Sequence, residues 1–190
     1  MTREQRVSSA PPIIGKSIRL RYAEPADAEF VLSLRLDERR NRFINRTATE
    51  VEKQAAWFTA YKERERAGAE HYFIIELLDR TPVGTVRIYD YRGDSFCWGS
   101  WLIKPDAPSQ VAIESALNIY EFAFCSLGFR KSHFDVRRDN ERVVAFHQRF
   151  GARILLSDEQ DYFFEFTKEA YEKVRTKYRK FLPANIDANV

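Results

Sequence analysis

Cysteine and long apolar runs are scarce in this sequence of 190 residues. The two cysteines, Cys97 and Cys125, are too few for a disulfide framework or a metal site, and they suit a reducing compartment. No stretch approaches the ~20 apolar residues that a membrane span needs. The opening segment MTREQRVSSAPP lacks the apolar stretch of a secretory signal. We therefore predict a cytoplasmic protein with no membrane span and no metal.

The sequence also lacks a large excess of one charge, because it has 31 basic and 28 acidic residues. Nucleic-acid-binding domains usually carry a one-sided basic excess, so we expect no nucleic-acid partner. One hydrophobic core serves chains of up to roughly 250 residues, which predicts a single domain. We place that domain at residues 15–182, after a disordered lead-in over 1–14 and before a tail over 183–190. Pro11 and Pro12 block regular structure in the lead-in.

Hydrophobic periodicity predicts a mixed α/β fold. Short turns join the three strands expected between residues 72 and 103, and such turns join antiparallel neighbours. The strand–helix–strand crossing over 96–137 predicts one parallel pair in an otherwise antiparallel sheet. The expected strands are 18–22, 72–78, 83–91, 96–103, 132–137, 153–156 and 162–166. The expected helices begin at Pro25, at Thr47 or Thr49, after Pro108, at Asn140 and at residue 169.

Motifs for dinucleotides and nucleoside triphosphates are absent: no Gly-x-Gly-x-x-Gly follows a strand, and no Gly-Lys-Ser/Thr occurs. A strand ending in a turn that feeds a long helix does occur, from Trp101 to Gln110. The unpaired N–H groups of a first helical turn can cradle a phosphate, and Ser109 is the expected N-cap. Most such turns bind nothing, so this signal alone is weak.

A second motif runs from Val136 through Asn140 and His147 to Gly151. It has a strand ending in valine, an asparagine four residues on, and a short amphipathic helix closed by an aromatic residue and glycine. This pattern resembles the C-terminal motif of the GNAT superfamily of N-acetyltransferases. The opening Ile18-Arg-Leu-Arg with Pro25-Ala-Asp-Ala, and the strand from Pro82, are also similar. The resemblance spans roughly residues 16–168.

The resemblance implies an acyltransferase that uses acetyl-CoA. The strand 96–103 would pair with pantetheine, and the next turn and helix would bind the pyrophosphate. Strands 96–103 and 132–137 would splay to admit the thioester, which an amine attacks directly. The implied cofactor-binding residues are Leu102, Ile103, Lys104, Ser109, Gln110, Val111, Ala112, Ile113, Asn140 and His147. Residues 108–113 contain no glycine, unlike the family pattern, which puts the affinity for CoA in doubt.

His147 stands where the family usually has a tyrosine that protonates the leaving thiolate. An imidazole can donate a proton near neutral pH, so we expect His147 to be the catalytic acid. The alternative is a half-buried structural histidine. For the general base the candidates are His71, Glu76, Glu114 and Asp135, or a base that acts through water.

An arginine-rich stretch before a helix that carries tryptophan resembles the aminosugar-nucleotide acetyltransferases of the pseudaminic-acid pathway. Arg35, Arg39 or Arg42 would hold a nucleotide diphosphate. Phe43 or Trp57 would stack on a base or sugar, with His71 also at the substrate site. The alternative is a solvated basic loop and a core tryptophan.

We therefore expect an amino sugar nucleotide of surface-polysaccharide synthesis as the acceptor. The oligomeric state is left open, with a homodimer as one option. The alternatives are acetylation of a peptide N-terminus or a polyamine, or a GNAT-like binding module without activity.

Overall fold

The computed structural model describes residues 12–37 and 49–183. They form one sheet of eight strands in the order β1-β2-β3-β4-β5-β6-β8-β7. The strands are β1 (Ile13–Ile14), β2 (Ile18–Tyr22), β3 (His71–Leu77), β4 (Pro82–Arg92), β5 (Ser95–Ile103), β6 (Lys131–Arg137), β7 (Arg153–Ser157) and β8 (Asp161–Thr167). The helices are α2 (Ala28–Leu36), α3 (Val51–Arg66), α4 (Gln110–Glu121), α5 (Glu141–Phe150) and α6 (Lys168–Lys177). The predicted mixed α/β fold is confirmed.

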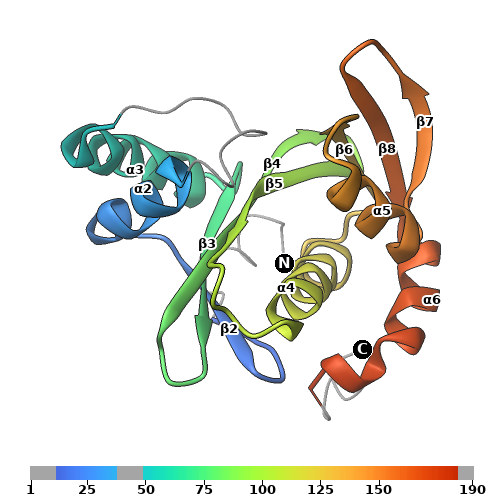
Figure 1. The fold of residues 1–190 in the computed structure, drawn as a ribbon, viewed down its shortest axis with the longest axis horizontal. Helices are drawn as coiled ribbons and strands as arrows, with labels where there is room; N and C mark the ends of the chain where they lie inside the picture. The colour runs from blue at the N-terminus through green and yellow to red at the C-terminus, as the bar shows by residue number, and fades with distance from the viewer. Residues whose placement is uncertain (1–11, 38–48, 184–190) are drawn as a thin grey trace.

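The helices cover both faces of the sheet (Figure 1). Because side chains alternate along a strand, Tyr72 and Ile74 of β3 join Phe58 of α3 in a small cluster on one face. Phe73 and Ile75 point the other way into the large core, which includes the buried side of α4. The sheet therefore separates the pair α2 and α3 from α4.

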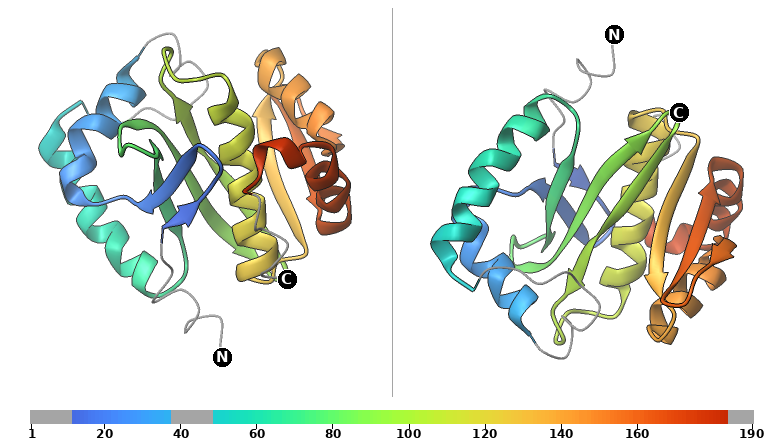
Figure 2. Two further views of the ribbon diagram at one scale, coloured as in Figure 1. Left: turned by 90° about the horizontal axis from the view of Figure 1, so that it is seen from below. Right: turned by 90° about the horizontal axis from the view of Figure 1, so that it is seen from above.

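The one parallel pair, β5 with β6, lies in the middle of the sheet and is paired only at its start. Ser95 pairs with Lys131 and Phe96 pairs with Ser132, and the two strands share no further pair in the described part of the chain. The other neighbouring strands pair antiparallel. The predicted parallel pair, and its splay toward the carboxyl ends, are thus confirmed (Figure 2).

Several predicted boundaries were wrong. Ile13 and Ile14 pair with Arg19 and Leu20, so the ordered chain begins before residue 15. Helix α3 starts at Val51 with Glu50 at its N-cap and no side-chain cap, so Thr49 does not start a capping box. The competing start, Thr47, lies outside the described residues.

The long helix from Gln110 also differs from the prediction, because it does not stay α-helical to its end. It passes into a π-helical turn, η3 (Phe122–Ser126), before Gly128 takes the left-handed conformation with φ +77°. A wider turn shifts side chains relative to a regular helix. Phe122, the first residue of the turn, packs its ring edge against His71 and Phe73.

Candidate active site

The gap between β5 and β6 is where an extended ligand can enter the sheet. Past Phe96, the side of β5 that faces β6 has no strand partner among the described residues. Backbone N–H and C=O groups need partners when they leave water. An extended chain with amide groups of its own can satisfy such an edge as an added strand. The geometry therefore suits a ligand that contains amides.

A bulge in β5 lies beside this gap. On the β4 side, Arg87 pairs with Gly99 and Thr85 pairs with Leu102, so β5 holds one extra residue between these pairs. At this bulge Ser100 adopts a left-handed backbone conformation, with φ +47°. Such a conformation is uncommon for a residue with a side chain. The hydroxyl of Thr85 donates to the carbonyl oxygen of Ser100 at 2.8 Å and holds the bulge in place. Bulges are over-represented next to active sites.

His147 of α5 lies among aromatic rings. Its centroid is 4.4 Å from that of Phe134 on β6 and 5.5 Å from that of Trp98 on β5, with Trp101 and Phe164 further out. Only 5% of His147 is exposed. Burial lowers the pKa of His147 to about 3, because no charge nearby compensates for the lost hydration of the imidazolium.

This environment corrects the expected titration of His147 near neutral pH. A neutral imidazole holds no readily released proton, but it keeps one N–H that can donate a hydrogen bond. The structure therefore supports His147 as a hydrogen-bond donor and not as a proton reservoir. Trp98 and Trp101 are themselves fixed to α4, because their indole N–H groups donate to Tyr120 at 2.9 Å and to Ser115 at 3.0 Å.

The turn into α4 carries the other residues that the resemblance assigned to CoA. Leu102 and Val111 are buried, so only their backbone can face a ligand. The remaining residues of this set are partly or fully exposed: Ile103, Lys104, Ser109, Gln110, Ala112 and Ile113. Ser109 occupies the N-cap position as predicted, but its side chain makes no capping hydrogen bond. The first turn of α4 thus keeps N–H groups that its own cap does not satisfy.

Asn140 lies at the start of α5, just past the end of β6. Its carbonyl accepts from the N–H groups of Val143 and Val144, both at 3.0 Å. Its side chain makes no capping bond and is partly exposed. An amide in this position can donate to and accept from a ligand that leaves the gap between the strands.

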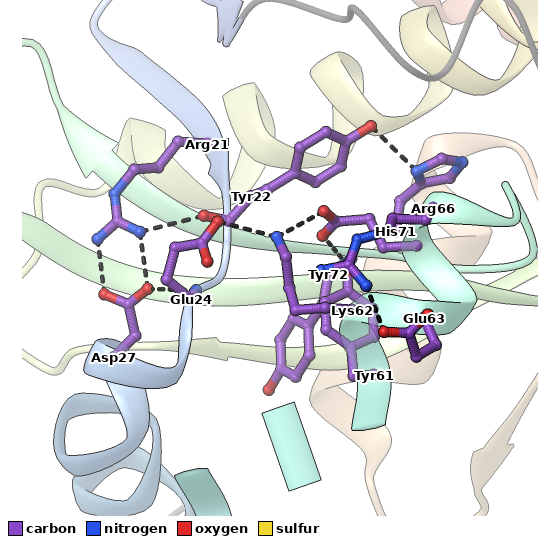
Figure 3. Close-up of polar contacts among 11 residues, drawn as sticks. Arg21, Tyr22, Glu24, Asp27, Tyr61, Lys62, Glu63, Arg66, His71 and Tyr72 are labelled. Atoms are coloured by element: carbon purple, nitrogen blue, oxygen red, sulfur yellow. Dashed lines mark hydrogen bonds and ion pairs between the residues drawn. The ribbon is translucent and has the colours of Figure 1, made fainter. Parts of the chain in front are cut away.

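Glu76 is not suited to act as a base. It is 4% exposed and lies between two guanidinium groups, with Arg19 at 2.9 Å and Arg21 at 2.6 Å. Arg21 also holds Asp27 through two bonds of 2.7 Å (Figure 3). Each of the two carboxylate oxygens of Glu76 therefore lies within ion-pair distance of an arginine side chain. Glu76 is therefore best explained as the ion-pair centre that joins β2 to β3.

The other acidic candidates differ in their surroundings. Glu114 is 2% exposed and accepts from the backbone N–H and the hydroxyl of Ser17, at 2.8 and 2.7 Å, which makes it an anchor for the β1–β2 turn. Asp135 is exposed on β6. Its side chain points to the sheet face opposite Phe134, which contacts His147. The assignment of Asp135 as the general base stays a prediction.

His71 is fully buried on the α4 side of the sheet. Its Nδ1 lies 3.1 Å from the hydroxyl of Tyr22, as Figure 3 shows, and its ring contacts Phe73 and Phe122. Tyr72, the next residue along β3, points to the opposite face and joins the α3 cluster. These contacts favour a structural role for His71 over contact with a substrate.

Trp57 of α3 packs toward β4, where Arg87 lies over its ring. Tyr61 stacks parallel to it with centroids 5.7 Å apart, and the guanidinium groups of Arg64 and Arg87 each lie 5.3 Å from its ring. Glu70 pairs with Arg87 at 2.7 Å and completes this arrangement. Faces occupied in this way leave little room for a base or sugar, so the core alternative for Trp57 is favoured.

The remaining substrate predictions concern the arginine-rich stretch. Arg35 is partly buried and lies near Tyr72. Burial raises the pKa of the Tyr72 hydroxyl, and the positive charge of Arg35 opposes that rise. Arg39, Arg42 and Phe43 lie outside the described residues.

Tyr89 and Gly99 are site residues that the sequence analysis missed. A Cβ atom at position 99 would lie 2.9 Å from the hydroxyl of Tyr89, so the glycine admits that hydroxyl to the backbone just before Ser100. Arg87 covers the ring of Tyr89, with its guanidinium 4.7 Å from the centroid. A glycine inside a strand often marks a close approach, and that signal at Gly99 was available in the sequence.

The described residues hold neither a metal-binding cluster nor a membrane-spanning helix. No group of three or more histidine, cysteine or acidic side chains within residues 12–37 and 49–183 could hold a metal ion. In the same residues, no helix is long and apolar enough to cross a bilayer.

A splayed parallel pair with a bulge in its first strand suits an acyl carrier with an amide-bearing arm. Residues 17–153 match the family model for the acetyltransferase (GNAT) domain. The chain belongs to the GNAT family, and it is an acyl-CoA-dependent N-acyltransferase.

Solved structures share this fold. The apo structure of FdhC, a nucleotide-linked sugar GNAT, is 38% identical, with a TM-score of 0.85, over 92% of this chain and 100% of that one. Spermidine N-acetyltransferase from Vibrio cholerae, solved with CoA and spermine, shares 16% identity and a TM-score of 0.69 over 82% and 98% of the two chains. A GNAT acetyltransferase from Bacillus anthracis shares 16% identity and a TM-score of 0.70 over 84% and 99%. No curated protein matches the sequence significantly.

Proposed function

We infer that the protein transfers an acetyl group from acetyl-CoA to the amino group of a nucleotide-linked amino sugar. The observation that carries the acceptor class is the 38% identity to FdhC, which extends over all of that chain. The spermidine N-acetyltransferase and the Bacillus anthracis acetyltransferase share only the fold with this chain, at 16% identity each. They therefore do not favour one class of acceptor over another. A role in surface-polysaccharide synthesis, a cytoplasmic location and a homodimer stay predictions.

The residues at the gap fit acetyl-CoA. The unpaired side of β5 past Phe96 would receive pantetheine as an added strand. The turn at Ser109 and Gln110, with the uncapped first turn of α4, would receive the pyrophosphate. Asn140 would bind the arm through its amide. Donors from a helix start need no glycine, so the glycine-poor turn is compatible with binding.

Bound acetyl-CoA supplies a thioester whose carbonyl carbon is open to an amine, with a thiol as the leaving group. The bulge at Ser100 would set backbone groups of β5 beside that carbonyl. The imidazole N–H of His147 would donate a hydrogen bond to the sulfur and stabilise negative charge on it. In the balanced reaction the amine gives up one proton and the departing sulfur gains one. Asp135, or water beside it, would accept the proton from the amine.

Binding of CoA is the first test. Stabilisation at a concentration of about 100 times the dissociation constant amounts to about 2.7 kcal/mol. For a domain of this size that corresponds to a rise in Tm of roughly 5–10 °C. A protein that shows no rise with millimolar CoA would contradict the proposed cofactor and support the inactive-module alternative.

The acceptor is tested by direct comparison. Release of free thiol from acetyl-CoA would be followed with UDP- and dTDP-linked amino sugars, spermidine, and a peptide with a free N-terminus. We expect turnover with a nucleotide-linked sugar, and loss of that turnover when the same sugar lacks its nucleotide. Turnover with spermidine or the peptide alone would contradict the sugar assignment.

A further inference from the structure

One imidazole joins three strands at the point where β5 and β6 separate. His133 is the first residue of β6 past the last parallel pair, Phe96 with Ser132. Its Nδ1 lies 2.7 Å from the hydroxyl of Ser95 on β5, and its Nε2 lies 3.3 Å from a carboxylate oxygen of Asp90 on β4. We call these three residues the His133 clasp.

Both ring nitrogens of His133 have a hydrogen-bond partner in the clasp. The Nδ1 atom shares a hydrogen bond with the hydroxyl of Ser95, a residue that is 4% exposed. The N–H at Nε2 then donates to Asp90. Because its two nitrogens bond to side chains from β5 and β4, the ring is held in one orientation by two different strands.

The backbone around the clasp is shaped to present Asp90. Its φ of +49° lies in the left-handed region, at an irregularity in the β4–β5 pairing between Tyr89 and Arg92. Arg92 also holds the Asp90 carboxylate, at 2.6 Å. An uncommon backbone conformation persists where the surroundings require it, and such positions cluster at functional sites.

Only a short stretch of backbone fastens β6 to β5 at this end. The carbonyl of Asp94, in the turn before β5, accepts from the N–H groups of Arg130 and Lys131 at 2.9 and 3.3 Å. Two parallel residue pairs follow, and then the strands part. The side-chain bonds of His133 therefore act at the fork itself, where a small change in strand direction becomes a larger displacement at the open end.

We propose that His133 is a positioning residue that sets how far β5 and β6 separate, and thereby the fit of the acyl-CoA arm between them. This inference rests on the proposed function. Asp135 lies two residues further along β6 and points to the same face as His133. The clasp would accordingly also set the place of Asp135 relative to the bulge at Ser100.

The test measures CoA binding by titration calorimetry, at a temperature where thermal unfolding shows every variant to be folded. His133→Phe keeps a ring but loses both bonds, and Ser95→Ala loses one. Since a hydrogen bond contributes about 0.5–1.5 kcal/mol, we expect each variant to bind CoA roughly two- to twelvefold more weakly. The double variant should be no weaker than His133→Phe alone, because both remove the same unit. His133→Gln, which still reaches Asp90, should lie between wild type and His133→Phe.

Arg130→Ala is the matched control, since Arg130 is exposed and adjoins the start of β6, and it should bind CoA like wild type. A lower Tm with unchanged CoA affinity in His133→Phe and Ser95→Ala would show that the clasp is only structural, and would overturn the proposal. Failure of the wild-type protein itself to bind CoA would overturn the proposed function, and the clasp's role with it. The wild-type titration therefore separates the two failures.

Discussion

The imidazole of His147 lies against the ring of Phe134, with the two centroids 4.4 Å apart. His147 comes from α5 and Phe134 from β6, so this contact joins the helix of the C-terminal motif to the strand that borders the gap. Its chemical consequence is that His147 is neutral at physiological pH, since burial lowers its pKa to about 3.

Replacing His147 by phenylalanine should therefore lower kcat less than removal of a true acid would. A hydrogen bond to a charged group contributes about 1.5–3 kcal/mol, which corresponds to roughly 10- to 100-fold in rate. Steady-state kinetics with saturating acetyl-CoA measure the change. His147→Tyr, which keeps a donor, should retain more activity than His147→Phe. Equal activity of His147→Phe and wild type would show that the imidazole only packs.

The same pKa predicts how stability depends on pH. The unfolded chain binds a proton on His147 below its ordinary pKa of 6.5, whereas the folded chain does so only below about 3. Stability due to this group is thus fully present above pH 6.5 and is lost as the pH falls toward 3. At pH 5 the loss is at most about 2 kcal/mol. Melting temperatures at pH 7.5 and pH 5 should accordingly differ less for His147→Phe than for wild type, and an equal difference would contradict the neutral assignment.

Gly99→Ala should disturb the site through Tyr89. The added Cβ would lie 2.9 Å from the Tyr89 hydroxyl, a separation too short for a carbon atom, and Tyr89 cannot retreat freely because Arg87 covers its ring. We expect lower kcat and a loss of stability of about 1–3 kcal/mol from overpacking. Combining the change with Tyr89→Phe removes the oxygen and should restore part of the stability, which denaturant unfolding would measure. Additive losses in the double variant would argue against this contact.

Glu76→Gln and Asp135→Asn should behave in opposite ways. Glu76→Gln leaves Arg19 and Arg21 without their shared carboxylate and should cost about 1–3 kcal/mol of stability, allowing for their partial exposure. Its kcat, measured where the protein is folded, should stay near that of wild type. Asp135→Asn should keep its stability, because Asp135 is exposed, and should lower kcat. A reversed pattern would assign the base to Glu76.

Much of the fold follows from local sequence. Alternation of apolar residues from Ile18 to Tyr22, and their helical spacing after Pro108, depend only on near neighbours, and the structure confirms both elements. The crossover from β5 through α4 to β6 predicts a parallel pair by chain geometry alone. The start of α3 was predicted less accurately, since the capping box at Thr49 does not form. Ser109 is the N-cap of α4 as predicted, although its side chain makes no capping bond.

The chemistry of the site was decided by contacts that only the tertiary structure makes. Glu76 resembles a base until Arg21, 55 residues earlier, is seen to bind it. His147 resembles an acid until rings from β5, β6 and β8 are seen to exclude water from it. Periodicity is encoded between neighbours in the chain, whereas the charge state of a group depends on hydration and on partners that folding brings from distant strands. The sequence by itself therefore determined the family and the order of the elements, and the packing of the sheet decided which side chains can move a proton.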